Sequence, residues 1–444
     1  MNFVEGRRLL TASFCAVLGG LLATQPAPAA ADNSENIFGG FDHFVYTQTN
    51  DSPNAIVGFR RDQLGNLSPV PGSPFATGGT GVFDPAGILG PFDADQQLAI
   101  DRDRFLLFAV NAGSNTIAAF HIVPESGSLV PVHGSPFPSG GINPISVGVR
   151  GDQLVIINQN QNQANPASVN GQTPNIVTRH ITLEGRLVEL LDDTTLPLPQ
   201  GSSPSQALTT NTGPFVFDPE FAPPAQAPAN PPFPVGTLAS YRLSPTGKLT
   251  PTSGSPPAFD STAAPGVLTA APLGAWASPV ARELYVGVTG QSALATFTWD
   301  HEGNPSFQSL VPLTGKAVCW VRVNHKGSRV YTSNTGSHTI DTLDIVTDPA
   351  RPIDLSQSAA IGGPQGTATL ELEVDPTDAF VYVVSQSDAV GGSATTPPTT
   401  RATVPNKLHV LKVSRDGNSL TEVSTGTPIP TINPAAKIHG VAVF

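Results

Sequence analysis

Short, mostly apolar runs recur along this chain, and turn residues separate the runs. The clearest run is Phe-Leu-Leu-Phe-Ala-Val-Asn at 105–111, followed by Thr-Ile-Ala-Ala-Phe-His-Ile at 116–122. Runs rich in Val, Ile, Phe, Tyr and Thr, bounded by Gly, Pro, Asn and Asp, are typical of β-strands. No long stretch after residue 40 shows the 3.6-residue apolar period of a helix. The pattern therefore predicts an all-β fold.

One unit of four short strands recurs along the chain. Its second strands are expected to begin near Phe44, Phe105, Leu154, Phe215, Leu284, Val330 and Val381. The turns before the fourth strands contain Gly65, Gly127, Gly185, Gly247, Gly303 and Gly417, and the sixth unit is degenerate near Pro352–Leu355. Such recurrence predicts a β-propeller of seven four-stranded blades. Six or eight blades are the alternatives, because the fourth and fifth units are weakly marked.

Each end of the chain contains part of a unit. Residues 437–444 have the pattern of an innermost strand with no strands after it, and residues 44–50 that of a second strand with no innermost strand before it. Together they complete one blade, so we expect the C-terminal strand to pair with the N-terminal blade and close the ring. Closure leaves no large sheet edge unpaired. The alternating apolar positions expected between neighbouring sheets are Leu98/Ile100, Val147/Val149, Val321/Val323, Leu372/Val374 and Val441/Val443.

The N-terminal residues 1–31 have the pattern of a signal peptide. Arg7 and Arg8 are followed by an apolar run at 9–23 and by small residues before Asp32. We therefore expect an exported protein, periplasmic or extracellular, with a linker at 32–43 and the propeller at 44–444. The Pro-rich segment 219–234 and the segment 391–405 are predicted loop insertions. Removal of the signal peptide leaves Cys319 as the remaining cysteine, which excludes an intramolecular disulfide.

Composition narrows the classes of partner. The net charge is −12 and charged residues make up 13% of the chain, which argues against nucleic acid and anionic membrane surfaces. Metal-loop, phosphate-loop and nucleophile-elbow motifs are missing from the sequence. We expect a monomer without metal or cofactor, whose partner is a small molecule, a glycan or a protein of the cell envelope.

Several segments resemble the lactonase-type seven-bladed propellers, which include relatives of 6-phosphogluconolactonase and carboxymuconate cyclase. They are Val-Asn-His-Lys-Gly-Ser-Arg-Val-Tyr-Thr-Ser-Asn at 323–334, the run 105–117, and Gly-Ser-Pro-Phe at 72–75 and 134–137. The resemblance implies a propeller fold and a site at the mouth of the central channel. Enzymes of this family carry a Gly-Pro-Arg-His-like start on some innermost strands. The matching positions here hold Ala317–Trp320, Leu370–Glu371, His439–Gly440, Gln96–Gln97 and Ile145–Ser146.

Lactone opening needs a base to activate water and a donor for the developing oxyanion. The candidate catalytic residues are His439 as base, with Glu371 and Arg322. The candidate ligand-binding residues at the rim are Asp93, Asp95, Asn143, Trp320, Glu373 and Lys437.

Each candidate also has a structural alternative. His439 would be a hydrogen-bonded rim residue, Glu371 and Glu373 would be held by bonds between blades, and Trp320 would be a wedge between blades. Because no innermost strand carries the complete family signature, we favour a non-catalytic binding propeller. The alternative is a hydrolase or cycloisomerase that acts on a small anionic lactone.

Overall fold

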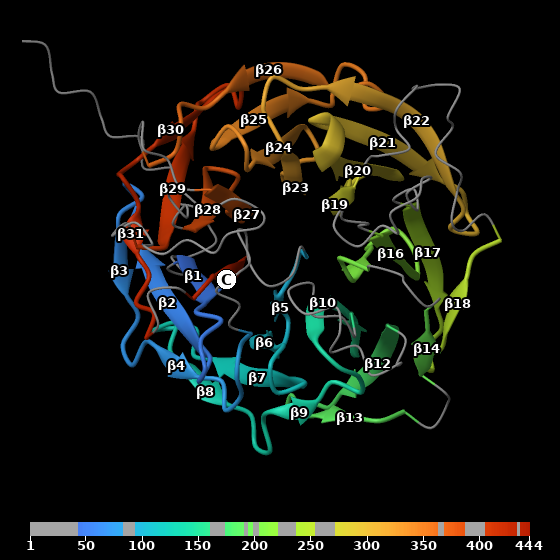
Figure 1. Cartoon of the computed structure of the whole chain (residues 1–444), viewed down its shortest axis with the longest axis vertical. Helices are drawn as coiled ribbons and strands as arrows, with labels where there is room; N and C mark the ends of the chain where they lie inside the picture. The colour runs from blue at the N-terminus through green and yellow to red at the C-terminus, as the bar shows by residue number, and fades with distance from the viewer. Residues whose placement is uncertain are drawn as a thin grey trace, which may run out of the picture. The chain divides into compact units, whose positions relative to one another are not determined.

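The computed structural model describes ten stretches of the chain, which belong to one compact unit. They are residues 43–82, 94–159, 174–190, 194–198, 204–220, 237–253, 271–362, 368–386, 405–432 and 436–444. Contacts divide the chain into Met1–Gly40 and Phe41–Phe444, and every described residue lies in the second unit. The described strands of this unit form seven antiparallel sheets around a ring (Figure 1). The predicted all-β, seven-bladed β-propeller is confirmed.

Each sheet, or blade, follows a path of four strands from the axis outwards. Blade 1 contains β32 (His439–Val443), β1 (His43–Gln48), β2 (Ala55–Arg61) and β3 (Leu67–Pro69). Blade 2 contains β5 (Leu98–Asp101), β6 (Leu106–Asn111), β7 (Thr116–Ile122) and β8 (Leu129–Pro131). Blade 3 contains β10 (Pro144–Arg150), β11 (Gln153–Asn158), β12 (Asn175–Ile181) and β13 (Leu187–Val188). Short strands β4 (Phe75–Ala76), β9 (Phe137–Pro138) and β14 (Thr195–Pro197) pair with the third strands of these blades.

The remaining blades repeat this order. Blade 4 contains β15 (Leu208–Thr209), β16 (Phe215–Glu220), β17 (Thr237–Leu243) and β18 (Leu249–Pro251). Blade 5 contains β19 (Pro272–Ala277), β20 (Glu283–Val288), β21 (Ala293–Trp299) and β22 (Pro305–Pro312). Blade 6 contains β23 (Val318–Val323), β24 (Arg329–Asn334), β25 (Thr339–Asp344) and β26 (Ile353–Gln357). Blade 7 contains β27 (Ala368–Val374), β28 (Phe380–Gln386), β29 (Lys407–Val413) and β30 (Leu420–Glu422), with β31 (Thr427–Pro428) beside β29.

The chain closes its ring by pairing its two ends. β32 runs antiparallel to β1, with Val443 opposite Val45. The N–H of Phe44 donates to the carbonyl of Phe444 at 3.2 Å, and the N–H of Phe444 donates to the carbonyl of Phe44 at 2.8 Å. Figure 1 shows the C-terminus beside β1. The prediction that the last strand completes the first blade is confirmed.

The apolar phase of the innermost strands is buried between neighbouring blades, as the alternation predicts. Val321 and Val323 pack in one cluster with Tyr285 of the preceding blade. Leu372 packs in another cluster with Tyr331 of the blade before it. Every predicted second strand begins within one residue of the observed strand. In the innermost strands, local alternation therefore sets the face that packs against the neighbouring blade, whereas second strands such as β6 and β11 are buried in both phases.

The turn before the fourth strand forms a further contact between blades. Gly127 of blade 2 has φ +71°, and a Cβ at this position would overlap the ring of Phe44 in blade 1. Gly65 of blade 1 has φ +94° and abuts Phe380 of blade 7 in the same way. A positive φ together with a ring in contact favours glycine. The recurring glycine of the repeat is thus part of the blade interface.

A polar cluster fastens blade 7 to blade 1 at the seam of the ring. Arg61 ends β2, and its Nη2 lies 2.8 Å from Oδ2 of Asp375, which follows β27. Its Nε donates to the hydroxyl of Tyr382 at 2.6 Å, and its guanidinium lies 4.3 Å from the centre of the Phe380 ring. The cluster therefore joins strands from the two ends of the chain.

Some predictions fall on residues outside the described part of the chain. These are the signal peptide 1–31, the linker 32–43 apart from His43, and most of the insertions 219–234 and 391–405. They stay predictions. Among the described residues, no helix has the length and apolar character that crossing a membrane requires.

Candidate functional site

Most of the predicted site residues lie on the innermost strands. Trp320 and Arg322 belong to β23, Glu371 and Glu373 belong to β27, and His439 begins β32. Trp320 and Arg322 are two positions apart in the regular part of β23 and therefore share one phase of the strand, whereas a β-bulge between Thr369 and Leu372 interrupts the alternation at Glu371. The ring thus brings side chains that are far apart in the sequence to its axis.

The segment Ala94–Gln96, here called the axial segment, lies between the innermost strands. Its first carbonyl accepts the indole N–H of Trp320 in blade 6 at 2.8 Å. The N–H of Asp95 donates to the carbonyl of Ser205, next to blade 4, at 2.9 Å. Its last carbonyl accepts the N–H of Val147 in blade 3 at 2.9 Å. Because it bonds to three blades around the ring, the axial segment occupies the axis.

Arg322 is buried beside the axial segment, with an exposed fraction of 1%. Its Nη1 and Nη2 each donate to one carboxylate oxygen of Asp95 at 2.8 Å, and its Nε donates to Glu373 at 3.1 Å. Nη1 also donates to the carbonyl of Val321 at 2.8 Å, and the guanidinium lies 4.2 Å from the centre of the Trp276 ring. Burial alone would lower the pKa of Arg322, but the two carboxylates outweigh burial and raise it. Arg322 is therefore a charged group whose partners are supplied by the protein.

Glu371 is a buried carboxyl group close to this ion pair. Neither of its oxygens makes a hydrogen bond of normal geometry with a described residue. Burial raises the pKa of Glu371 well above its usual range, and the charge of Asp95 adds to the rise. Arg322 and the backbone N–H of Val441 act in the other direction and lower the pKa of Glu371, because they favour its charged form. The Glu371 carboxyl therefore keeps its proton to higher pH than an exposed glutamate.

His439 is also buried, and its imidazole is a weak base. Burial lowers the pKa of His439 to about 3, and the charge of Lys437 contributes to the decrease. Its Nε2 lies 3.3 Å from Nε2 of Gln386, an amide nitrogen that can only donate, which places the imidazole proton on Nδ1. Nδ1 has no hydrogen-bond partner among the described residues.

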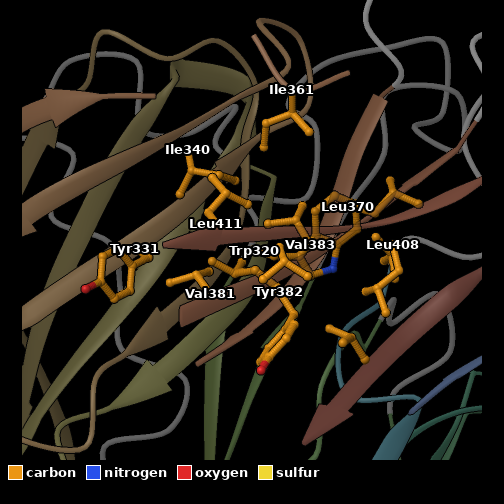
Figure 2. Packing of buried hydrophobic residues seen from close by; sticks show 14 of the residues in the cluster. Trp320, Tyr331, Ile340, Ile361, Leu370, Val381, Tyr382, Val383, Leu408 and Leu411 are labelled. Atoms are coloured by element: carbon orange, nitrogen blue, oxygen red, sulfur yellow. The ribbon is translucent and has the colours of Figure 1, made fainter. Parts of the chain in front are cut away.

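Trp320 packs inside the apolar core of blades 6 and 7. Its exposed fraction is 1%, and it lies in one cluster with Tyr331, Leu370 and Tyr382 (Figure 2). Its ring centre is 6.5 Å from that of His439. A side chain so deeply buried offers no face for a ligand to stack on, so this position favours the structural alternative of a wedge between blades.

A small hollow lies next to His439, between the innermost strands of blades 1, 2 and 3. The polar residues of its lining are Gln48, Asn50, Gln97 and His439. Gln48 ends β1, and Gln97 comes directly before β5, so the hollow lies at the end of the ring where innermost strands begin and second strands end. Its free volume is about 10 Å³, which is close to what one water molecule needs.

Comparisons with solved structures give the fold of this chain. No family model and no curated protein matches the chain. A solved structure of a candidate 6-phosphogluconolactonase from Bacteroides uniformis ATCC 8492 has a TM-score of 0.64 at 12% identity, covering 91% of this chain and 100% of that one. The periplasmic gluconolactonase of Pseudomonas aeruginosa has a TM-score of 0.57 at 15% identity, covering 90% of this chain and 98% of that one. This chain has the fold of the lactonase-like propellers. At 12% and 15% identity, the similarity to these two structures shows the fold alone.

The other predicted rim residues occupy different surroundings. Asn143 is half-buried before β10, with φ +55°, and its backbone N–H donates to Oδ1 of Asn115 at 2.9 Å. Lys437 is buried beside β32 with an exposed fraction of 4%. Asp93 lies outside the described residues. Asp95, Arg322 and Glu373 are brought together, and Glu371 lies close enough to share their field.

Sequence reasoning missed the glutamines near the axis. Gln48 and Gln97 are 2% and 4% exposed and line the hollow beside His439. Gln206 is buried between blades, and its amide bonds to Gln96 and to the backbone of Ala275. The available signal was the Gln96–Gln97 pair, which stands where the family has its basic signature. Among the described residues, no group of three or more His, Cys, Asp or Glu side chains is placed to hold a metal ion.

Proposed function

We propose that this protein is an exported, non-catalytic binding propeller. The observation that carries the proposal is that the protein itself occupies the guanidinium of Arg322. In a lactonase, this cation would have to bind the anionic lactone or the oxyanion. Asp95 and Glu373 neutralise it, its guanidinium makes four hydrogen bonds within the protein, and Trp276 covers its face. A substrate would have to break a buried ion pair to reach it, which is costly.

The two other candidate catalytic groups are also poorly matched to lactone opening. A general base works best with a pKa near the operating pH, whereas the pKa of His439 is about 3. Glu371 has a raised pKa, but its exposed fraction is 0%. The three residues therefore do not supply an accessible base and an accessible oxyanion donor. This supports binding without covalent chemistry.

Lactone turnover tests the proposal directly. The protein lacking residues 1–31 is incubated at pH 7 with glucono-δ-lactone, its 6-phosphate and a muconolactone, and ring opening is followed by acid release. We expect rates equal to the spontaneous rates, with no difference for the Glu371→Ala/His439→Ala double variant. Turnover that the double variant abolishes would refute the proposal.

Export is a separate part of the proposal and rests on residues 1–31. Expression of the full chain in a bacterial host, followed by cell fractionation and N-terminal sequencing, is expected to give an envelope or medium protein that begins at Asp32. Cytosolic protein that keeps its first residue would contradict export.

The second candidate function is a hydrolase or cycloisomerase acting on a small lactone. It is favoured by the opposite pKa shifts of two buried groups on the innermost strands of blades 7 and 1, because burial raises the pKa of Glu371 and lowers that of His439. Solved structures with this fold include the gluconolactonase of Pseudomonas aeruginosa. The lactone assay distinguishes the two functions.

A further inference from the structure

The axial segment lies outside the strands, directly before β5, and its own carboxylate helps to hold it at the axis. Asp95 accepts two hydrogen bonds from Arg322 at 2.8 Å, and its Oδ1 also accepts the N–H of Gln96 at 2.7 Å. A Cβ added to Gly274 would lie 2.9 Å from Oδ2 of Asp95, so this glycine leaves room for the carboxylate. The position of the axial segment therefore depends on the Asp95–Arg322 pair.

Three carboxyl groups lie around the one guanidinium of Arg322. They are Asp95 of the axial segment, and Glu371 and Glu373 of β27. The hydrogen bonds that Arg322 donates go to Asp95, to Glu373 and to the carbonyl of Val321. Both oxygens of Glu371 are buried without a hydrogen-bond partner among the described residues. The guanidinium is thus shared by two of the three carboxyl groups.

The proton on Glu371 keeps this group of charges balanced. Burial raises the pKa of Glu371 well above its ordinary value of 4.5, and the charge of Asp95 adds to the rise. His439 on the neighbouring strand β32 has a pKa of about 3 and brings no charge at neutral pH. Because the raised pKa belongs to the folded arrangement, that arrangement is favoured at low pH and loses its advantage as the pH rises through this pKa.

Loss of that proton favours an exchange of partners. A buried carboxylate without a partner costs much free energy, and Arg322 is the cation whose charge acts on Glu371. Glu371 and Glu373 are fixed on β27, whereas Asp95 belongs to a segment outside the strands. Asp95 is therefore the carboxylate that can leave the guanidinium.

We propose that the proton of Glu371 holds the axial segment in place, and that its release to solvent at alkaline pH transfers Arg322 from Asp95 to Glu371 and opens the axis. In the open state the N–H of Gln96 has lost its acceptor on Asp95, and the bonds of the axial segment to Trp320 and Ser205 are broken. This inference goes beyond the proposed function, because it holds whether the propeller binds or converts its ligand.

Amide hydrogen exchange tests this inference, measured by mass spectrometry on the protein lacking residues 1–31. The readout is the exchange of the Asp95 and Gln96 amides. Glu371→Gln is the decisive variant, because its amide has the shape of the protonated acid and cannot ionise. At pH 6 the native protein and the variant are expected to exchange equally. At pH 9 the native protein is expected to exchange at least tenfold faster than the variant.

Asp341→Asn is the matched control. Burial also raises the pKa of Asp341, but this residue lies in β25 of blade 6 and accepts hydrogen bonds from Gln357 and from the N–H of Gly315. The variant is expected to exchange like the native protein at both pH values. The amides of β6 in blade 2 report global unfolding and are expected to keep their protection at pH 9.

The inference is overturned if the native protein and Glu371→Gln exchange the two amides equally at pH 9, or if Asp341→Asn slows exchange as Glu371→Gln does. Loss of protection in β6 to the same extent also overturns it, since the opening is then global. If Glu371→Gln does not fold, the native protein alone decides. Protection at residues 95–96 must then fall at least tenfold from pH 6 to pH 9 while β6 stays protected, and unchanged protection refutes the inference.

Discussion

At the scale of single residues, the axis of the ring holds charges that the protein itself compensates. Arg322 depends on Asp95, which lies more than two hundred positions earlier in the sequence. Both side chains have an exposed fraction of 1% or less. A buried ion pair is stable only if its hydrogen bonds have good geometry. Removal of one partner leaves the charge of the other buried and uncompensated.

Asp95→Ala is therefore expected to lower the free energy of unfolding by about 3–5 kcal/mol. The measurement is urea denaturation at pH 7. The double variant Asp95→Asn/Arg322→Met serves as the comparison, because it removes the cation together with its partner and should recover part of the loss. A single variant as stable as the native protein would show that Asp95 is not the partner on which Arg322 depends.

His439 makes stability depend on pH in the acid range. Its pKa is about 3 in the folded protein against an ordinary value of 6.5, so between these values the unfolded chain binds a proton that the folded protein does not. Its contribution is present above pH 6.5 and is lost as the pH falls towards 3. Between pH 7.5 and 4.5 the native protein should lose up to about 2–3 kcal/mol more than His439→Gln. Equal losses in urea denaturation at the two pH values would contradict this.

At the scale of elements, the turn glycines of the repeat connect one blade to the next. The turn before β8 passes so close to Phe44 of β1 that a side chain has no room. This explains why glycine recurs before the fourth strand in the sequence. The turn before β8 reverses the chain, and its contact with Phe44 also sets the distance between blades 1 and 2.

Gly127→Ala is expected to destabilise the protein by about 2–5 kcal/mol, from left-handed backbone strain and overpacking against Phe44. Gly151→Ala provides the control. Gly151 has φ +56° but nothing within 4 Å of a Cβ, so only the backbone cost of about 1–2 kcal/mol applies. Thermal unfolding of both variants would test the difference. Equal destabilisation would show that the Phe44 contact does not matter.

At the scale of the whole molecule, stability depends on closure of the ring. β32 contributes the innermost strand of blade 1, and the Arg61–Asp375 cluster fastens the same seam. Without this strand, two blades would lose a neighbour at the axis. The apolar faces of β1 and of blade 7 would then be open to water.

Deletion of residues 437–444 is therefore expected to abolish cooperative unfolding or to lower the melting temperature severely. Thr47→Val is the milder comparison, because it removes one hydrogen bond to Gly440 across the seam, from Oγ1 at 2.7 Å. It should cost about 1 kcal/mol. Differential scanning calorimetry measures both, and a truncated protein that melts like the intact chain would contradict closure by β32.

The sequence alone predicted the strands, the closure of the ring and a count of seven blades, with six or eight as the alternatives. These features follow from local alternation and from recurrence of one unit. Neither pattern depends on how side chains far apart in the sequence are placed in space. The start of β6 near Phe105 and the incomplete unit at 437–444 could be read directly from the order of residues.

Only the tertiary structure decided what the residues at the axis do. The sequence placed Arg322 and Glu373 at equivalent positions of neighbouring blades but could not show that they pair, nor that Asp95 binds the same guanidinium. The hollow at Gln48 and Gln97 was equally hidden. Its side chains come from separate strands, and whether a polar atom finds a partner depends on distances that exist only after the ring has closed.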